Sequence, residues 1–266
     1  MKSTVIDNTD TKVSRFSFGT ASLHHVLGAA KRQRLLNAAY ENGITHFDTS
    51  PYYGYGISEN ELGRFRSDKA STITITTKVG LYGPVDSART TLNIWTYKAL
   101  GKLYKPYSKP EVDWSVERAE KSLESSLKRI GSDSVDFLFL HEPDIVLLNV
   151  DEISEWMEKE NERGTVRHWG LAGTKERLLP WLYSSHPLTN ILQTRDNLVD
   201  KTADFVLEAG RKLQFTSGYF TSHGRSDEGA ADDVLLAAIL DRNISGSVIV
   251  STRRPERLTV IGQILS

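Results

Sequence analysis

Residues 46–63 read HFDTSPYYGYGISENELG and contain, in order, a strand end, a glycine-rich turn and a helix start. Residues 44–47 are apolar and β-branched enough to form a short buried strand. Ser58 and Glu61 have the spacing of a capping box, so we expect a helix to begin near Ile57. A carboxylate and phenols lie between the strand and the helix. A loop in this position is where an α/β scaffold usually carries its chemistry.

The composition limits the classes of partner and of chemistry. The chain has 266 residues, with 33 Lys and Arg against 34 Asp and Glu, a formal charge of -1. This balance gives no electrostatic reason to expect nucleic acid or a membrane surface as a partner. Cysteine is absent, which excludes disulfides, thiolate metal sites and a catalytic cysteine. With no signal-like N-terminus and no spanning apolar run, we expect a soluble cytoplasmic protein.

Apolar strand-like runs alternate with helical segments along the whole chain, in eight pairs. We expect strands at Arg15–Gly19, Ile44–Asp48, Thr72–Thr77, Val135–Leu140, Val166–Leu171, Asn190–Gln193, Leu213–Thr216 and Ser247–Val250. We expect helices at Ala29–Glu41, Ser58–Phe65, Asp113–Ile130, Val150–Arg163, Lys175–Ser184, Lys201–Ala209, Asp232–Asp241 and Pro255–Ile264. In the third helix Asp113 is the expected N-cap and Gly131 the expected stop. Eight such units predict a closed (β/α)₈ TIM barrel in one domain, residues 1–266. An open doubly wound sheet is the alternative.

Residues 79–112 interrupt this alternation, between the third strand and its helix. A loop of this length in a compact domain is usually functional or disordered. The segment contains five Trp or Tyr residues together with four lysines. We therefore expect a lid or pocket wall, and a solvated insertion is the alternative.

Ionisable side chains end three successive strands of the predicted barrel. Asp48 closes the second strand, Lys78 the third and His141 the fourth, and Tyr53 follows Asp48 by five residues. Each alone has an ordinary explanation, as a turn former, a snorkelling lysine, a core histidine or a surface aromatic residue. The C-terminal ends of barrel strands meet at one rim, so the fold brings all four together. We therefore expect an active site there.

These four side chains suit proton donation to a carbonyl oxygen. A phenol has an unperturbed pKa near ~10, and we expect the ammonium of Lys78 to lower the pKa of Tyr53. Asp48 would keep Lys78 charged and fixed, and a neutral His141 would orient the substrate oxygen. None of the four can supply a hydride. A redox reaction at this site therefore needs a nicotinamide cofactor.

Three segments together resemble the aldo-keto reductases. They are residues 47–63, which surround Asp48 and Tyr53, the TKVG of residues 77–80, and the VDFLFLHEPD of residues 135–144. The resemblance covers nearly the whole chain in the family's order. It implies a TIM barrel that reduces a small aldehyde, ketone or sugar derivative to an alcohol. It makes Tyr53 the general acid, tuned by Asp48 and Lys78, with His141 positioning the carbonyl.

The resemblance also implies a set of cofactor contacts. Ala172 and Gly173 stand where the family usually has a Ser-Asn pair on the nicotinamide amide, so Gln193 is left for that contact. Phe215 is expected to stack on the nicotinamide, and Arg257 to bind a 2′-phosphate, which favours NADPH over NADH. The expected contacts are Thr20, Gln193, Phe215, Ser217, Gly218, Ser251, Thr252, Arg253 and Arg257.

The remaining expectations concern the substrate, the assembly and other functions. The short segment after the last helix leaves the 79–112 loop as the expected pocket wall, and His24, His25, Tyr52 and Glu142 are weaker candidates for substrate contact. We expect a monomer or weak oligomer. A metal-dependent hydrolase or a Schiff-base lyase is disfavoured, because no His-x-His pair or ligand cluster appears, and we expect no metal. A non-catalytic nucleotide-binding relative is the other alternative.

Overall fold

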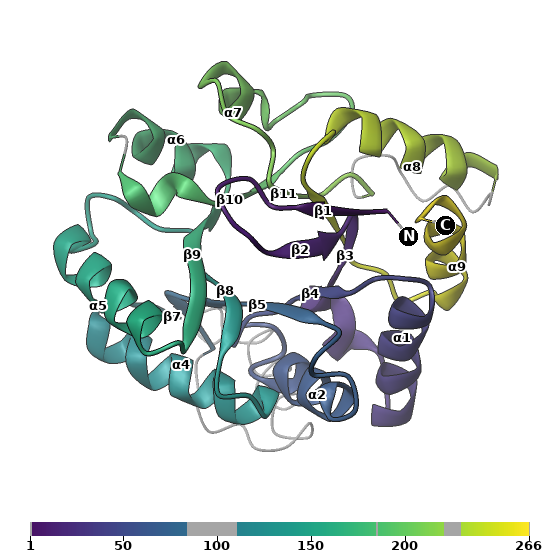
Figure 1. Ribbon diagram of the computed structural model, residues 1–266, viewed down its shortest axis with the longest axis horizontal. Helices are drawn as coiled ribbons and strands as arrows, with labels where there is room; N and C mark the ends of the chain where they lie inside the picture. Colours follow the sequence, from purple (N-terminus) through teal and green to yellow (C-terminus); the bar gives the residue numbers. More distant parts are fainter. Residues whose placement is uncertain (1, 84–110, 185, 221–229, 266) are drawn as a thin grey trace, which may run out of the picture.

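Eight parallel strands form a closed barrel surrounded by helices (Figure 1). The computed structural model describes residues 2–83, 111–184, 186–220 and 230–265. The barrel strands are β3 (Phe16–Gly19), β4 (His46–Asp48), β5 (Thr74–Val79), β8 (Val135–His141), β9 (Val166–Gly173), β10 (Leu192–Arg195), β11 (Phe215–Ser217) and β12 (Ser247–Val250). Each strand pairs with the next in this order, and β12 pairs with β3 to close the ring. The (β/α)₈ prediction is confirmed.

The helices follow the strands as the sequence pattern predicts. They are α1 (Ala29–Glu41), α2 (Ile57–Arg66), α4 (Val116–Ile130), α5 (Val150–Glu162), α6 (Lys175–Ser184), α7 (Asp204–Glu208), α8 (Ala230–Arg242) and α9 (Pro255–Leu265). Two short 3₁₀ helices, Thr20–His25 and Pro187–Asn190, precede α1 and β10. Of the predicted long loop, residues 84–110 lie outside the described residues. Its ends form a small antiparallel pair, β6 (Leu81–Tyr82) and β7 (Glu111–Val112).

Two predicted helix caps are wrong. Ser115, not Asp113, is the N-cap of α4, with its hydroxyl accepting from the Arg118 N–H at 3.4 Å. The helix therefore begins two residues later, and Asp113 instead accepts from the Ser115 N–H at 2.9 Å. In α2 the N-cap is Gly56, and Ser58 donates its hydroxyl hydrogen outside the helix. The predicted stop of α4 is confirmed, because Gly131 has φ 68 in the left-handed region.

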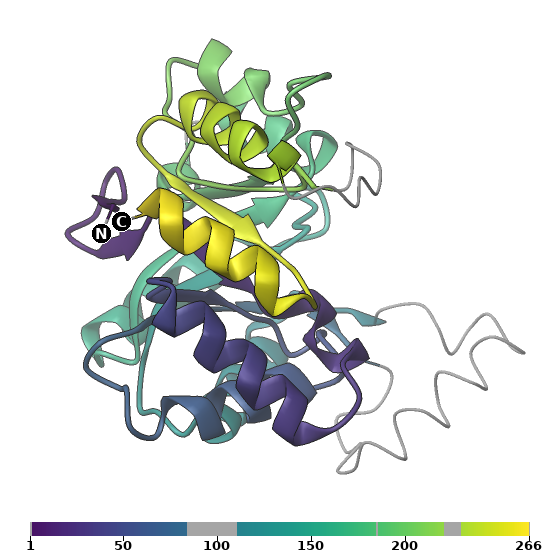
Figure 2. The ribbon, with the colours of Figure 1, turned by 90° about the vertical axis from the view of Figure 1, so that its right-hand side faces the viewer.

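A two-stranded hairpin that the sequence pattern did not predict covers one end of the barrel (Figure 1 and Figure 2). It consists of β1 (Ser3–Val5) and β2 (Lys12–Ser14). Its turn is held against the first residues of the barrel strands, since Gln214 Nε2 donates to Asp7 O at 2.8 Å and Arg167 pairs with Asp10 at 2.8 Å. The hairpin thus closes the N-terminal end, and the C-terminal end is left for the loops that follow the strands.

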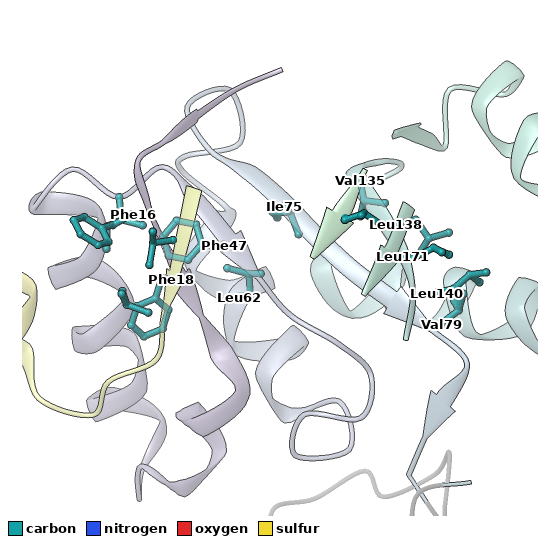
Figure 3. Packing of buried hydrophobic residues seen from close by; sticks show 14 of the residues in the cluster. Phe16, Phe18, Phe47, Leu62, Ile75, Val79, Val135, Leu138, Leu140 and Leu171 are labelled. Carbon is teal, nitrogen blue, oxygen red and sulfur yellow. The ribbon is translucent and has the colours of Figure 1, made fainter. Parts of the chain in front are cut away.

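Two apolar layers stabilise the barrel. The outer layer lies between strands and helices and includes Phe16, Phe18 and Phe47 (Figure 3). The ring centroids of Phe47 and Phe65 of α2 are 5.0 Å apart. The inner layer fills the barrel and consists of Ile6, Val13, Phe137, Phe139, Ala172, Ile191, Phe215 and Ile249. This packing makes the barrel a solid support for its rim.

A neutral histidine lies within the inner layer. His46 is 0% exposed, its Nδ1 is 2.8 Å from Thr74 Oγ1, and its Nε2 is 3.0 Å from Thr76 Oγ1. Its ring stacks on Phe215 with the centroids 5.2 Å apart. Burial, with a smaller contribution from the charge of Lys78, lowers the pKa of His46 from 6.5 to about 3. The folded protein therefore holds this imidazole uncharged.

The pH dependence of stability tests this assignment. The depressed pKa means that only the unfolded chain binds a proton here between pH 6.5 and about 3. The stabilising contribution is present above pH 6.5 and is lost as the pH falls, by about 1.4 kcal/mol per pH unit. We expect His46→Gln to reduce the slope of the unfolding free energy against pH by the equivalent of about one bound proton. Urea unfolding at several pH values measures this slope. The exposed His25→Gln is the control, and equal slopes for wild type and His46→Gln would contradict the assignment.

Candidate active site

The turn after β4 is tied to the first loop of the barrel by Thr20. Its hydroxyl donates to Asp48 O at 3.0 Å and lies 2.9 Å from Thr49 Oγ1. The Ser58 hydroxyl of α2 donates to Thr20 O at 3.0 Å. These bonds fix Asp48 at the rim. Thr20, expected as a cofactor contact, is completely buried beneath the rim.

Asp48 and Lys78 form a buried ion pair at the rim. Lys78 Nζ lies 2.5 Å from Asp48 Oδ1 and donates to Thr49 O at 2.9 Å. Both side chains are almost fully buried, with Lys78 1% exposed and Asp48 3% exposed. Burial raises the pKa of Asp48 and lowers the pKa of Lys78, and the pairing opposes both changes. The side chain of Gln193 also limits the rise in the pKa of Asp48.

Tyr53 and His141 complete the group. Lys78 Nζ lies 5.1 Å from the centroid of the Tyr53 ring. The rings of Tyr53 and His141 meet edge to face, with centroids 6.1 Å apart and an interplanar angle of 89°. Tyr53, Lys78 and His141 line one cavity of about 400 Å³. The structure thus brings the four predicted side chains together at the C-terminal ends of β4, β5 and β8.

The expected lowering of the Tyr53 pKa is wrong for this structure. Burial, with the nearby charges of Asp48 and Glu142, raises the pKa of the phenol well above 10. The ammonium of Lys78 is paired with Asp48, whose negative charge acts on the phenol in the opposite direction. Burial and Lys78 also lower the pKa of His141 to about 3. At neutral pH the cavity therefore presents a protonated phenol and an uncharged imidazole.

The predicted cofactor contacts fall into two groups. Gln193, Ser217, Gly218 and Ser251 line the cavity, on the side formed by β10, β11 and β12. Phe215 does not line the cavity. It is 1% exposed and packs in the inner layer, with its ring centroid 5.2 Å from that of Phe137. The side chain of Phe215 points into the barrel because the pleat alternates along β11, and Phe220 lines the cavity instead.

The predicted contacts in and just before α9 lie at two different surfaces. Thr252 Oγ1 accepts from the Arg254 N–H at 3.1 Å and so shapes the start of the helix. The guanidinium of Arg257 lies over the ring of the cavity residue Phe220, 5.1 Å from its centroid. Arg253 instead lines a separate groove of about 660 Å³ beside α1. Of the two predicted arginines, Arg257 is therefore the one that contacts a residue of the cavity wall.

The cavity wall also contains two charged residues, Glu142 and Arg195, which the sequence predicted weakly or not at all. Glu142 directly follows β8 and was a weak substrate candidate, whereas Arg195 ends β10 and was not predicted. The signal that could have found both is their place at the C-terminal ends of barrel strands. The other weak candidates, His24, His25 and Tyr52, are absent from the described lining of the cavity.

Within the four described ranges, no group of three or more His, Asp or Glu side chains is arranged to hold a metal ion. Within the same ranges, no helix combines the length and apolar character needed to cross a membrane.

Comparisons with known proteins show the family and the fold of this chain. The family model described as "Aldo/keto reductase family" matches residues 15–200, so the chain belongs to the aldo/keto reductase family. Similar solved structures include an aldo-keto reductase from Bacillus halodurans in its holo form, with a TM-score of 0.74 at 18% identity over 100% of this chain and 91% of that one. Another is an aldo-keto reductase from Klebsiella pneumoniae in complex with NADPH. Its TM-score is 0.69 at 18% identity, over 100% of this chain and 90% of that one. These structures support the fold.

Two curated relatives have more specific names. L-galactose dehydrogenase of Arabidopsis thaliana is 30% identical over 176 residues, which are 63% of this chain and 47% of the relative. D-threo-aldose 1-dehydrogenase of Pseudomonas sp is 27% identical over 166 residues, which are 60% of this chain and 50% of the relative. The chain thus spans about half the length of the curated relatives it matches. The family match ends at residue 200, before Ser217, Ser251 and Arg257.

The buried ion pair should matter for stability. Asp48→Ala leaves the Lys78 ammonium buried without its partner, so we expect the free energy of unfolding to fall by about 3–5 kcal/mol. The double variant Asp48→Leu/Lys78→Met should recover most of that loss in urea unfolding. The exposed pair Glu117–Lys121 provides the control, and Glu117→Ala should cause no measurable change. A loss for Asp48→Ala no larger than for the control would contradict the account.

Proposed function

We propose that this protein is an NAD(P)-dependent oxidoreductase that interconverts a small carbonyl compound and its alcohol. The observation that carries the proposal is the grouping of Tyr53, the Asp48–Lys78 pair and His141 around one cavity at the barrel rim. Membership of the aldo/keto reductase family supports it. The nicotinamide cofactor supplies the hydride, which no side chain in the cavity can do.

Tyr53 acts as the general acid in the reducing direction. Its raised pKa keeps the phenol protonated at neutral pH, so a proton is available for the carbonyl oxygen. The Lys78 ammonium, 5.1 Å from the ring centroid, stabilises the phenolate that forms as the proton leaves. Asp48 keeps that ammonium in place. In the oxidising direction the same phenolate accepts the proton of the alcohol.

His141 positions the carbonyl oxygen. Its Nδ1 is buried and has no hydrogen-bond partner among the described residues. With its pKa lowered to about 3, the imidazole is neutral across the physiological range and acts as a hydrogen-bonding group rather than as a proton donor. The pH dependence of turnover between pH 5 and 8 therefore does not come from His141.

The cavity suits a nicotinamide cofactor on chemical grounds. Gln193 has a buried oxygen, Oε1, with no hydrogen-bond partner in the described part of the chain, and Ser217, Gly218 and Ser251 extend the polar wall beside it. Arg257 lies just behind Phe220, where a guanidinium can bind a 2′-phosphate. NADPH is therefore the preferred cofactor in the proposal, with NADH as the alternative.

The substrate is a small aldehyde, ketone or sugar derivative. Relatives are named L-galactose dehydrogenase, D-threo-aldose 1-dehydrogenase and pyridoxal 4-dehydrogenase. A substrate screen should therefore begin with aldoses and pyridoxal, and should follow both oxidation and reduction. Detection of cofactor binding without turnover across the whole screen would instead identify a non-catalytic nucleotide-binding protein.

Fluorescence titration of NADPH and NADH tests the cofactor assignment. We expect the wild type to bind NADPH more tightly, and Arg257→Ala to weaken NADPH binding by tenfold or more, because a charge-assisted contact to phosphate is lost. NADH binding should change little. Arg253→Ala is the matched control, since Arg253 lines the separate groove beside α1. Failure of the wild type to bind either nucleotide would overturn the proposed function.

A further inference from the structure

Glu142 has an unusual backbone conformation at the cavity wall. It directly follows His141 and has φ 51, in the left-handed region that non-glycine residues rarely adopt. Its N–H donates to Ala172 O at 2.7 Å, a bond that ties the end of β8 to the end of β9. The residue therefore lies beside Ala172 and Gly173 in a conformation that costs free energy, of the kind that clusters at functional sites.

Gly173 makes room for the Glu142 carboxylate. A Cβ atom at position 173 would lie 3.1 Å from Glu142 Oε2 and 3.3 Å from the Cβ of Arg177, tighter than ordinary contacts. Thr174, immediately before α6, donates its N–H to the same Oε2 at 3.2 Å. Within the described part of the chain, Glu142 Oε1 accepts no hydrogen bond. One oxygen of the carboxylate is thus anchored, and the other is available to the cavity that Glu142 lines.

A second acceptor belongs to the same cavity. Gln193 is 8% exposed, and its side chain limits the rise in the pKa of Asp48. Its Oε1 is buried with no partner among the described residues. An unsatisfied buried acceptor costs about 1–3 kcal/mol, which a donor on a bound molecule recovers. β9 and β10 are adjacent strands with Ala172 opposite Gln193, so Glu142 and Gln193 lie on the same side of the cavity.

We propose that Glu142 accepts one N–H of the nicotinamide carboxamide, beside the contact of that carboxamide with Gln193 that the family resemblance implies. The inference rests on the proposed function, since it requires a nicotinamide cofactor in this cavity. A primary carboxamide presents two N–H donors in one plane, which two acceptors on one wall can satisfy. Ala172 and Gly173 at the end of β9 have no polar side-chain atoms. Glu142, which follows β8 and lies beside them, supplies the acceptor instead.

Hydrogen bonding and nearby arginines favour the ionised form of this carboxylate, against the effect of burial. Burial and Glu176 raise the pKa of Glu142, whereas the Thr174 N–H, Arg177 and Arg195 oppose that rise. Arg195 also lines the cavity, and Arg177 is paired with Asp144 at 2.5 Å. An ionised carboxylate accepts a stronger hydrogen bond than a neutral amide oxygen does. Glu142 is therefore expected to contribute more to carboxamide binding than a neutral acceptor would.

The test compares NADP⁺ with its 3-acetylpyridine analogue, in which a methyl ketone replaces the carboxamide and no N–H remains. The two dinucleotides carry the same charge, so long-range electrostatic effects cancel in the ratio of their dissociation constants. We measure that ratio by isothermal titration calorimetry for wild type, Glu142→Gly, Glu142→Gln and Asp151→Asn. If the wild type prefers the non-phosphorylated cofactor, NAD⁺ and its analogue replace this pair.

We expect the wild type to prefer NADP⁺ over the analogue, and Glu142→Gly to reduce that preference by about tenfold, the loss of one charge-assisted hydrogen bond. Glycine suits the positive φ of position 142, so this variant removes the side chain without adding backbone strain. Glu142→Gln retains an acceptor oxygen and should keep part of the preference. Asp151→Asn alters an exposed carboxylate outside the cavity lining and should leave the ratio unchanged.

Two results would overturn the inference. An unchanged ratio in Glu142→Gly would show that Glu142 does not bind the carboxamide, and an equal fall in Asp151→Asn would show that the effect is indirect. Both results are distinct from failure of the proposed function, in which the wild type binds no nicotinamide nucleotide. As a second variant, Gly173→Ala places a methyl group against the Glu142 carboxylate and should reduce the preference in the same direction.

Discussion

The buried ion pair between Asp48 and Lys78 is the interaction on which the site depends. It joins the C-terminal ends of β4 and β5, and the second bond of Lys78, to Thr49 O, fixes the start of the turn that carries Tyr53. Removing two charges from water is costly, so the pair persists because packing and hydrogen bonds hold both groups in one geometry. The solid barrel beneath, closed by the β1–β2 hairpin, supplies that rigidity.

The sequence pattern predicts much of the architecture, since each helix and strand has its own period. The bounds of α1 and α6 agree with the predicted ranges to the residue. The four rim side chains could be identified because parallel strands must bring their C-terminal ends to one edge. The β1–β2 hairpin escapes prediction because its short strands are held by contacts with residues far along the chain, such as Ser245 and Ser247.

The errors at the site arise from quantities that only the packed structure defines. The pKa of Tyr53 depends on burial and on the sum of nearby charges, and a single Tyr–Lys pairing does not represent that sum. Phe215 and Phe220 are five residues apart, and whether either faces the cavity depends on where β11 ends. Glu142 takes its place on the wall through a left-handed φ and the small size of Gly173, which spacing along the chain does not reveal.

Deuterium transfer from C4 of a labelled reduced nicotinamide cofactor to the carbonyl carbon of a substrate tests the central claim most directly. The account predicts that wild-type protein gives an alcohol carrying deuterium at the former carbonyl carbon, detected by mass spectrometry. It also predicts that Tyr53→Phe binds the cofactor but transfers label at least a hundredfold more slowly, about the contribution of a general acid. Transfer by Tyr53→Phe at the wild-type rate would contradict the assignment of the phenol as the proton donor.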